Sequence, residues 1–161
     1  MHTEKEREDL LSAIKKMVDG TTEELPPTLL CDFNHGDMVG QTFAFNDDRD
    51  KWMLTQIIYK LIQEDKCSWF GLILESWMAR ASKESGMTEE ELLSLPPSQR
   101  PGAQEVVMVT ISNSKKQHNF FGVLEKKGGK RYISKWDTLP EEASCQGRFT
   151  DLWRKAKAIT N

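Results

Sequence analysis

The sequence predicts an α+β fold, in which helices from both ends of the chain pack on a mainly antiparallel sheet of about four to six strands. Three observations lead to this prediction: amphipathic helical spacing near both ends, alternating or β-branched apolar runs in the middle, and a paired-glycine turn at residues 128–129. At 161 residues, with 38% hydrophobic and 29% charged residues, the chain has the length and composition of one globular domain, residues 1–161.

Three longer helices are predicted from capping residues and from apolar residues at helical spacing, and Thr88 with Glu91 could cap a short helix through Leu95. Thr3 and Glu6 form a capping-box pair for the first helix, and Gly20 ends it. The second helix starts at Asn46 or Asp47, where acidic residues suit the positive end of the helix dipole. The apolar stripes of the first, second and last helices are Leu10, Leu11, Ile14, Met17 and Val18; Leu54, Ile57, Ile58, Leu61 and Ile62; and Phe149, Leu152, Trp153, Ala156 and Ile159.

Residues 69–78 predict a central strand, because apolar side chains alternate onto both of its faces. A helix is the alternative for so short an apolar run. A meander follows at residues 106–112, 119–125 and 131–136, and a glycine-rich hairpin turn joins its last two strands. Residues 28–45 are expected to form two short extended pieces, the second around Phe43 and Phe45.

Composition and cysteine spacing indicate a cytoplasmic protein that does not enter the membrane. Apolar runs such as Leu72–Leu74, which ends at Glu75, are far short of the roughly 20 residues that a membrane-spanning helix needs. The charged stretch Met1–Asp9 is not followed by an apolar signal-peptide segment. Cys31, Cys67 and Cys145 are odd in number and widely spaced, which favours reduced thiols over a disulfide framework.

Glu75 lies inside the most apolar predicted strand, where an ionised carboxylate is costly unless it is paired. Arg80, Arg100 and Glu105 are expected to surround it, if the long proline-bearing connection folds back over the strand. Trp77 is expected on the same face, in the core or, as the less favoured alternative, in the wall of a pocket. These five residues are the candidate ligand-binding set, and a general acid or base at Glu75 is the alternative to a structural ion pair.

Asp32, His35 and Asp37 bring carboxylate and imidazole donors onto one predicted loop, a set that suits a divalent metal. The spacing matches no defined site, and a metal would need further ligands from elsewhere in the chain, for example His118 or Glu75. Asn, His, Gly and Asp also favour turns for backbone reasons, so a plain turn is the competing interpretation. The sequence contains no phosphate-binding loop, dinucleotide fingerprint or Cys-x-x-Cys pair, and no cofactor is predicted.

Basic residues concentrate towards the C-terminus, although the whole chain has a formal charge of −3. Residues 115–161 hold eleven lysines and arginines against five acidic residues, whereas residues 1–114 hold eleven against twenty. The candidate surface for an anionic partner such as nucleic acid consists of Lys126, Lys127, Lys130, Arg131, Arg154, Lys155 and Lys157. Ordinary solvated faces are the favoured interpretation, because an acidic protein binds nucleic acid poorly.

A Glu-x-Trp strand, a Pro-Ser-x-x-Pro loop and a strand that opens with Glu105 follow one another in residues 74–109. In these features the segment resembles a group of small hypothetical proteins of bacteria and their phages. The likeness covers little more than a fifth of the chain. It implies a bacterial or phage origin and a unit made of the loop and two strands, and it implies no activity. Residues 102–104 stand where the group would have a second arginine.

These observations favour a non-catalytic binding or accessory domain that contacts a protein or small ligand through its sheet face and the 79–104 connection. Aromatic residues are frequent in the predicted strands, the connection is long, and no complete catalytic set is present. The alternatives are a metal-assisted hydrolase that uses Asp32, His35 and Asp37, and a nucleic-acid-binding protein that uses the basic C-terminal residues.

Overall fold

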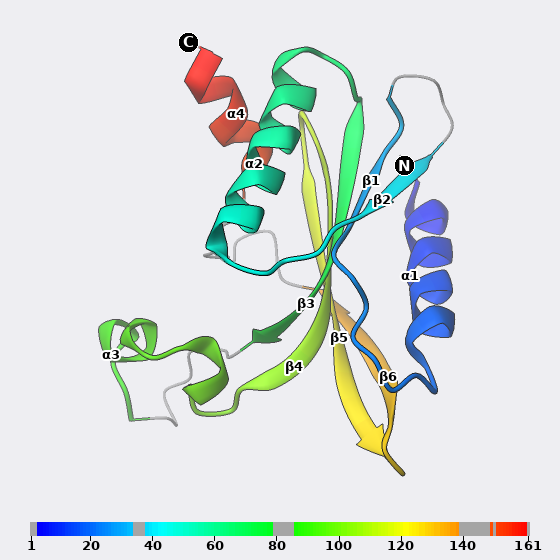
Figure 1. The fold of residues 1–161 in the computed structure, drawn as a ribbon, viewed down its shortest axis with the longest axis vertical. Coiled ribbons are helices and arrows are strands. Elements are labelled where there is room, and N and C mark those ends of the chain that lie inside the picture. Colours follow the sequence, from blue (N-terminus) through cyan, green and yellow to red (C-terminus); the bar gives the residue numbers. More distant parts are fainter. Residues whose placement is uncertain (1–2, 34–37, 79–85, 139–148, 150, 161) are drawn as a thin grey trace.

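The sheet has six antiparallel strands in the order β2-β1-β3-β4-β5-β6, and helices cover both of its faces (Figure 1). A computed structural model, which describes residues 3–33, 38–78, 86–138, 149 and 151–160, thus confirms the predicted α+β fold. The strands are β1 Thr28–Cys31, β2 Val39–Thr42, β3 Trp69–Met78, β4 Gln104–Asn113, β5 Gln117–Lys127 and β6 Lys130–Thr138. The helices are α1 Glu4–Val18, α2 Asp48–Gln63, α3 Glu89–Ser94 and α4 Leu152–Thr160, with a 3-10 turn, η2, at Pro97–Gln99.

Capping residues explain where the helices begin. The Oγ1 atom of Thr3 accepts a hydrogen bond from the Glu6 amide at 3.1 Å, as the capping-box pair predicts. Asp47, one of the two predicted caps, accepts from two amides of the first turn of α2 at 2.9 and 3.2 Å. α4 begins only at Leu152, so Phe149 precedes the helix whose apolar face it was predicted to join. Among the described helices, none is long and apolar enough to cross a membrane.

The central strand β3 pairs with β1 on one side and with β4 along its full ten residues on the other. The prediction of a strand at residues 69–78 is confirmed, and the helix alternative is wrong. Its side chains are buried on both faces as far as Leu74. The β5–β6 hairpin turns at Gly128 and Gly129, whose φ angles of 59° and 78° are ones that glycine adopts without a steric penalty.

Two hydrophobic clusters lie on opposite faces of this one sheet. On one side, called the α1 face, Leu11, Ile14 and Val18 pack against side chains of β3, β4 and β6. On the other side, called the α2–α4 face, the cluster consists of Leu29, Leu54, Ile58, Ile62, Phe70, Leu72, Leu74, Phe149, Leu152 and Ala156. β3 contributes to both clusters, because successive side chains of a strand point to opposite faces.

The structure corrects two details of the predicted elements. Phe43 and Phe45 follow β2 instead of forming it, and Phe45 stacks on Phe149 with ring centroids 6.1 Å apart. Both rings pack against the hydrophobic cluster of the α2–α4 face. The alternating aromatic residues at this position therefore mark packing against that cluster and not a strand. The stripe residues that are exposed at the margins of their helices are Met17, Ile57 and Ile159.

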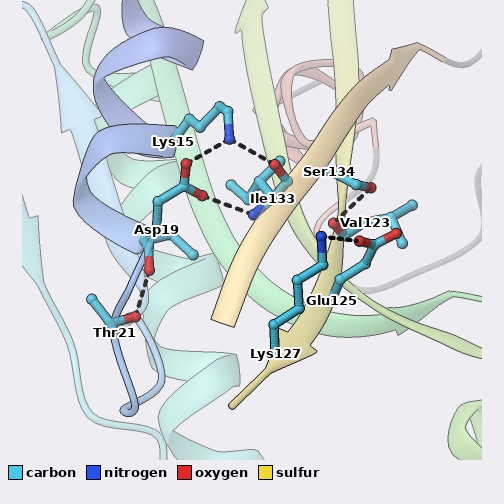
Figure 2. A network of polar contacts seen from close by, with 9 residues as sticks. Lys15, Asp19, Thr21, Val123, Glu125, Lys127, Ile133 and Ser134 are labelled. Atoms are coloured by element: carbon cyan, nitrogen blue, oxygen red, sulfur yellow. Dashed lines mark hydrogen bonds and ion pairs between the residues drawn. The ribbon is translucent and has the colours of Figure 1, made fainter. Parts of the chain in front are cut away.

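The C-terminal end of α1 covers the outer edge of β6 (Figure 2). The Lys15 ammonium donates to the Ile133 carbonyl at 2.8 Å, and the Asp19 carboxylate accepts from the Ile133 amide at 2.9 Å. Lys15 and Asp19 also pair with each other at 2.5 Å. Arg131 exchanges backbone hydrogen bonds with residues 20–21 at 2.8 and 2.9 Å. The outward backbone groups of these two β6 residues are therefore all occupied.

Candidate functional site

Glu75 is an anion on the α1 face that the fold holds in a fully paired environment. One carboxylate oxygen accepts from the Arg131 guanidinium at 2.7 Å, and the other accepts from the Leu25 amide at 2.9 Å. The side chains of Glu75 and Arg131 are only 11% and 6% exposed. The predicted contact between Glu75 and an arginine is present, and its described cation is Arg131 of β6, which was not among the predicted partners. With both oxygens engaged, the described contacts of Glu75 are those of a structural residue.

The pairing of Glu75 with Arg131 depends on the shape of the sheet. β3 and β6 are three strands apart, about 14 Å in a flat sheet. The normal twist of a sheet brings the outer strands over its concave face, and two long side chains bridge what remains. Residues 20–27 run from the Arg131 backbone to β1 and supply the Leu25 amide on the way. This segment therefore closes the α1 face at Glu75.

Trp77 lies beyond that closure on the same face of β3, and its side chain is 42% exposed. The expectation that Trp77 joins the core is wrong, whereas Trp69 at the other end of the strand is buried. Glu105 of β4 stands directly opposite Trp77 in the strand register. The Glu105 carboxylate lies 3.9 Å from the Lys126 ammonium. An indole and a carboxylate are thus side by side on an open part of the sheet.

The connection between β3 and β4 starts after Met78, next to Trp77 in the chain, and its α3 lies at the end of the molecule where β4 begins (Figure 1). Its described part contains α3 and η2, and η2 contacts β3. Arg100 donates from Nε to the Leu95 carbonyl at 3.1 Å, so it closes a turn within the connection and does not reach Glu75 by this group. Arg80 lies outside the described residues. Leu93 of α3 is exposed and adds apolar surface.

The predicted metal set is only partly described. Asp32 is buried at the end of β1 and accepts hydrogen bonds from the amide and the hydroxyl of Ser68. These bonds join the end of β1 to the residue that precedes β3. His35 and Asp37 lie outside the described residues. Within the described ranges, no three His, Cys, Asp or Glu side chains come together as metal ligands.

The predicted cationic surface is divided between two places. Lys126, Lys127 and Lys130 lie on the β5–β6 hairpin, whereas α4 with Arg154, Lys155 and Lys157 lies at the opposite end of the molecule (Figure 1). Arg131 is buried against Glu75 and does not belong to a surface. Arg154 pairs with Asp151 at 3.2 Å. The structure therefore does not join these residues into one continuous basic patch.

Cys31 and Cys67 are buried and free, and their thiols contact each other. Burial raises the pKa of the Cys31 thiol. Burial, together with the nearby Cys31 thiol, raises the pKa of Cys67 to about 12. Thiols with raised pKa values carry little thiolate at neutral pH, so neither cysteine is suited to nucleophilic catalysis. Cys145 lies outside the described residues.

Sequence reasoning missed the residues that organise this site. Arg131 was assigned to an anion-binding surface, and Lys15 and Asp19 had no predicted role. Their contacts join residues more than 50 positions apart in the chain, and no local pattern signals them. The one available signal was Glu75 itself, since a carboxylate in an apolar strand requires a cation from somewhere in the fold. Comparison with protein-family models, curated proteins and solved structures finds no significant match to this chain.

Proposed function

We propose that this protein is a non-catalytic binding or accessory domain of the bacterial or phage cytoplasm, which contacts a protein or small ligand through the open end of its α1 face. The observation that carries the proposal is Trp77, a large indole left 42% exposed on the central strand of a rigid sheet. Tryptophan is enriched among the residues that dominate binding energy at protein interfaces. Glu105, directly opposite Trp77 in the strand register, adds a polar contact.

The rest of the site explains why this surface is suited to recognition and not to catalysis. Both carboxylate oxygens of Glu75 are engaged by groups of the protein, the Leu25 amide and the Arg131 guanidinium. The contacts of Glu75 join β3 to β6 and to the segment before β1, and these bonds restrain the strand that carries Trp77. Rigid aromatic anchors bind with a small loss of conformational entropy.

The test is affinity purification from a bacterial lysate with tagged wild-type protein and three variants. Trp77→Ala is expected to lose the specific partners that the wild type retains, since removal of a central interface tryptophan costs about 2 kcal/mol or more. Glu105→Ala should weaken the same partners. Trp52→Ala is the matched control, because Trp52 is an exposed tryptophan on α2, on the other side of the sheet.

Circular dichroism must show that each variant keeps the wild-type fold before its partners are compared. The proposal fails if Trp77→Ala and Glu105→Ala retain every partner of the wild type. It fails equally if Trp52→Ala loses the same partners as Trp77→Ala, because a nonspecific loss would then explain both. A ligand screen by protein fluorescence gives the parallel test for small molecules, with Trp77→Ala as the variant that should no longer respond.

A further inference from the structure

The two outer strands of the sheet, β6 and β2, differ in whether other groups of the protein occupy their outward backbone atoms. At β6, the side chains of Lys15 and Asp19 and the backbone of residues 20–21 occupy the outward groups of Ile133 and Arg131. β6 also carries charged residues and lies beside a register shift in β5, and both features hinder pairing with another strand. At these two residues the β6 edge is closed to a further strand, and the charges and the register shift disfavour pairing along the rest of it.

β2, at the other edge, has none of these protections in the described part of the chain. The Phe43 amide donates to the Pro27 carbonyl at 2.8 Å, which shows that odd-numbered residues of this strand point their backbone groups towards β1. By the alternation of an antiparallel ladder, the backbone groups of Gly40 and Thr42 point outwards. All four β2 residues are exposed, and none is charged or proline. Among the described residues, the Thr42 carbonyl accepts a local bond, from the Gln41 side chain at 3.1 Å.

Apolar side chains lie beside this open edge. Val39 is 50% exposed on β2, on the α2–α4 face. Ile57 of α2 is 41% exposed. Each residue of an α-helix turns by about 100°, so Ile57 and Gln63, six residues apart, lie about 120° apart around the helix axis. Gln63 bonds to the backbone of α4 at 3.3 Å, so Ile57 is on the flank of α2 away from α4. The strand order places β1 and β2 on that flank (Figure 1).

We infer that β2 pairs with β2 of a second copy of this chain, antiparallel and across a twofold axis at Gln41. In that register Gly40 faces Thr42 of the second copy, and each of the two pairs exchanges both backbone hydrogen bonds. The outward donors and acceptors are symmetric about Gln41, so the edge is complementary to itself, as a twofold interface requires. Val39 would then lie opposite Phe43 of the second copy. An uncharged strand brings no like charges together at the axis.

The expected dimer is weak and depends on concentration. The strand is four residues long, and a short strand with a few flanking side chains buries less than the roughly 1,600 Å² of a standard stable interface. Pairing of the edges would join two sheets into one of twelve strands, because each copy supplies six. The inference rests on the β2 edge and is independent of binding at Trp77.

The test is sedimentation velocity of the full chain from about 1 μM to about 1 mM, a range that brackets weak interfaces. The wild type should pass from monomer to dimer. Thr42→Pro removes one outward amide from each copy, and proline is tolerated at an edge position whose amide faces solvent, so the monomer fold should persist. It should raise the dissociation constant roughly tenfold or more. Met17→Lys, at an exposed apolar residue of α1, is the matched control and should leave association unchanged.

A cross-link tests the register. Residues 41 of the two copies would form a non-hydrogen-bonded pair with Cα atoms about 4.5 Å apart, within the range of a disulfide. In Gln41→Cys, glutathione disulfide should oxidise one thiol from each copy to an intermolecular disulfide, with release of two reduced glutathiones. Ser134→Cys, exposed on β6, is the control and should cross-link several-fold more slowly.

Three outcomes would overturn the inference. The first is a wild type that stays monomeric to the highest concentration, with equal cross-linking of Gln41→Cys and Ser134→Cys. The second is a dimer whose dissociation constant Thr42→Pro leaves unchanged while circular dichroism shows a native fold. The third is a dimer that Met17→Lys abolishes. Loss of partners in Trp77→Ala bears on none of these results, so the two proposals stand or fall separately.

Discussion

At Glu75, a carboxylate lies beside the apolar cluster of the α1 face because the fold supplies a guanidinium and a backbone amide there. A buried ion pair contributes little net stability when both charges are present, because desolvation offsets their attraction. Removing one charge is different, since the other is left buried and uncompensated. The Nε atom of Arg131 is already buried without a hydrogen-bond partner among the described residues, which makes the loss of Glu75 more costly.

We therefore predict that Glu75→Gln lowers the free energy of unfolding by about 3–5 kcal/mol. The double variant Glu75→Leu/Arg131→Met should lose less than Glu75→Gln, because it leaves no unpaired charge. Urea unfolding followed by circular dichroism measures both. Glu125→Gln is the control, since Glu125 is half-exposed and lies 4.0 Å from Lys127. Equal effects of Glu75→Gln and Glu125→Gln would show that the buried pair has no special role.

At the scale of elements, charged side chains of α1 and of the residue after it hold the helix against the edge of β6: Lys15 and Asp19 bond to the backbone of Ile133 and to each other (Figure 2). Burial alone would raise the pKa of Asp19, but the hydrogen bonds from Lys15 and the Ile133 amide and the charge of Lys15 outweigh it, so the pKa is lowered below the ordinary value. A carboxyl whose pKa is lower in the folded state stabilises the fold at pH values above its unfolded pKa. That contribution disappears as the pH falls through the folded pKa.

Asp19→Asn should accordingly cost about 1 kcal/mol of unfolding free energy at pH 7, where the charge-assisted bonds are complete. The difference between wild type and Asp19→Asn should shrink as the pH falls below about 4, because the wild-type carboxyl then protonates. Urea unfolding at pH 7, 5 and 3 measures this difference. Asp9→Asn, at an exposed position of the same helix, should show little change at any pH. If Asp19→Asn lowers the free energy of unfolding equally at all three pH values, the charge of Asp19 does not stabilise the contact between α1 and β6.

At the scale of the whole molecule, two hydrophobic clusters share the strands of one sheet. Ile14 of α1 packs on one face and Ile58 of α2 on the other, and they are 2% and 0% exposed. β3 and β4 lie between the clusters and lose their cover if either helix detaches. The two faces should therefore unfold together, since neither cluster persists without the strands that it shares with the other.

Ile14→Ala and Ile58→Ala should each cost about 2–5 kcal/mol, the usual effect of removing a large buried side chain. In each variant, tryptophan fluorescence and far-ultraviolet circular dichroism should report the same urea midpoint. Met17→Ala, at an exposed position of α1, should stay within about 0.5 kcal/mol of wild type. Separate midpoints for the two probes would show that the faces unfold independently.

The sequence by itself determined the α+β class, the helix caps at Thr3 and Asp47, the hairpin at residues 128–129 and the two-sided burial of β3. Each of these follows from residues close together in the chain, whose spacing or φ preference favours that local structure over the alternatives. Only the tertiary structure decided that Arg131 pairs with Glu75 and that Trp77 is exposed. It alone showed that the basic residues divide between two ends, and that one sheet edge is covered while the other is open. These features depend on strand order and sheet twist, which alternating side-chain patterns leave undetermined because every order of the same strands satisfies them equally.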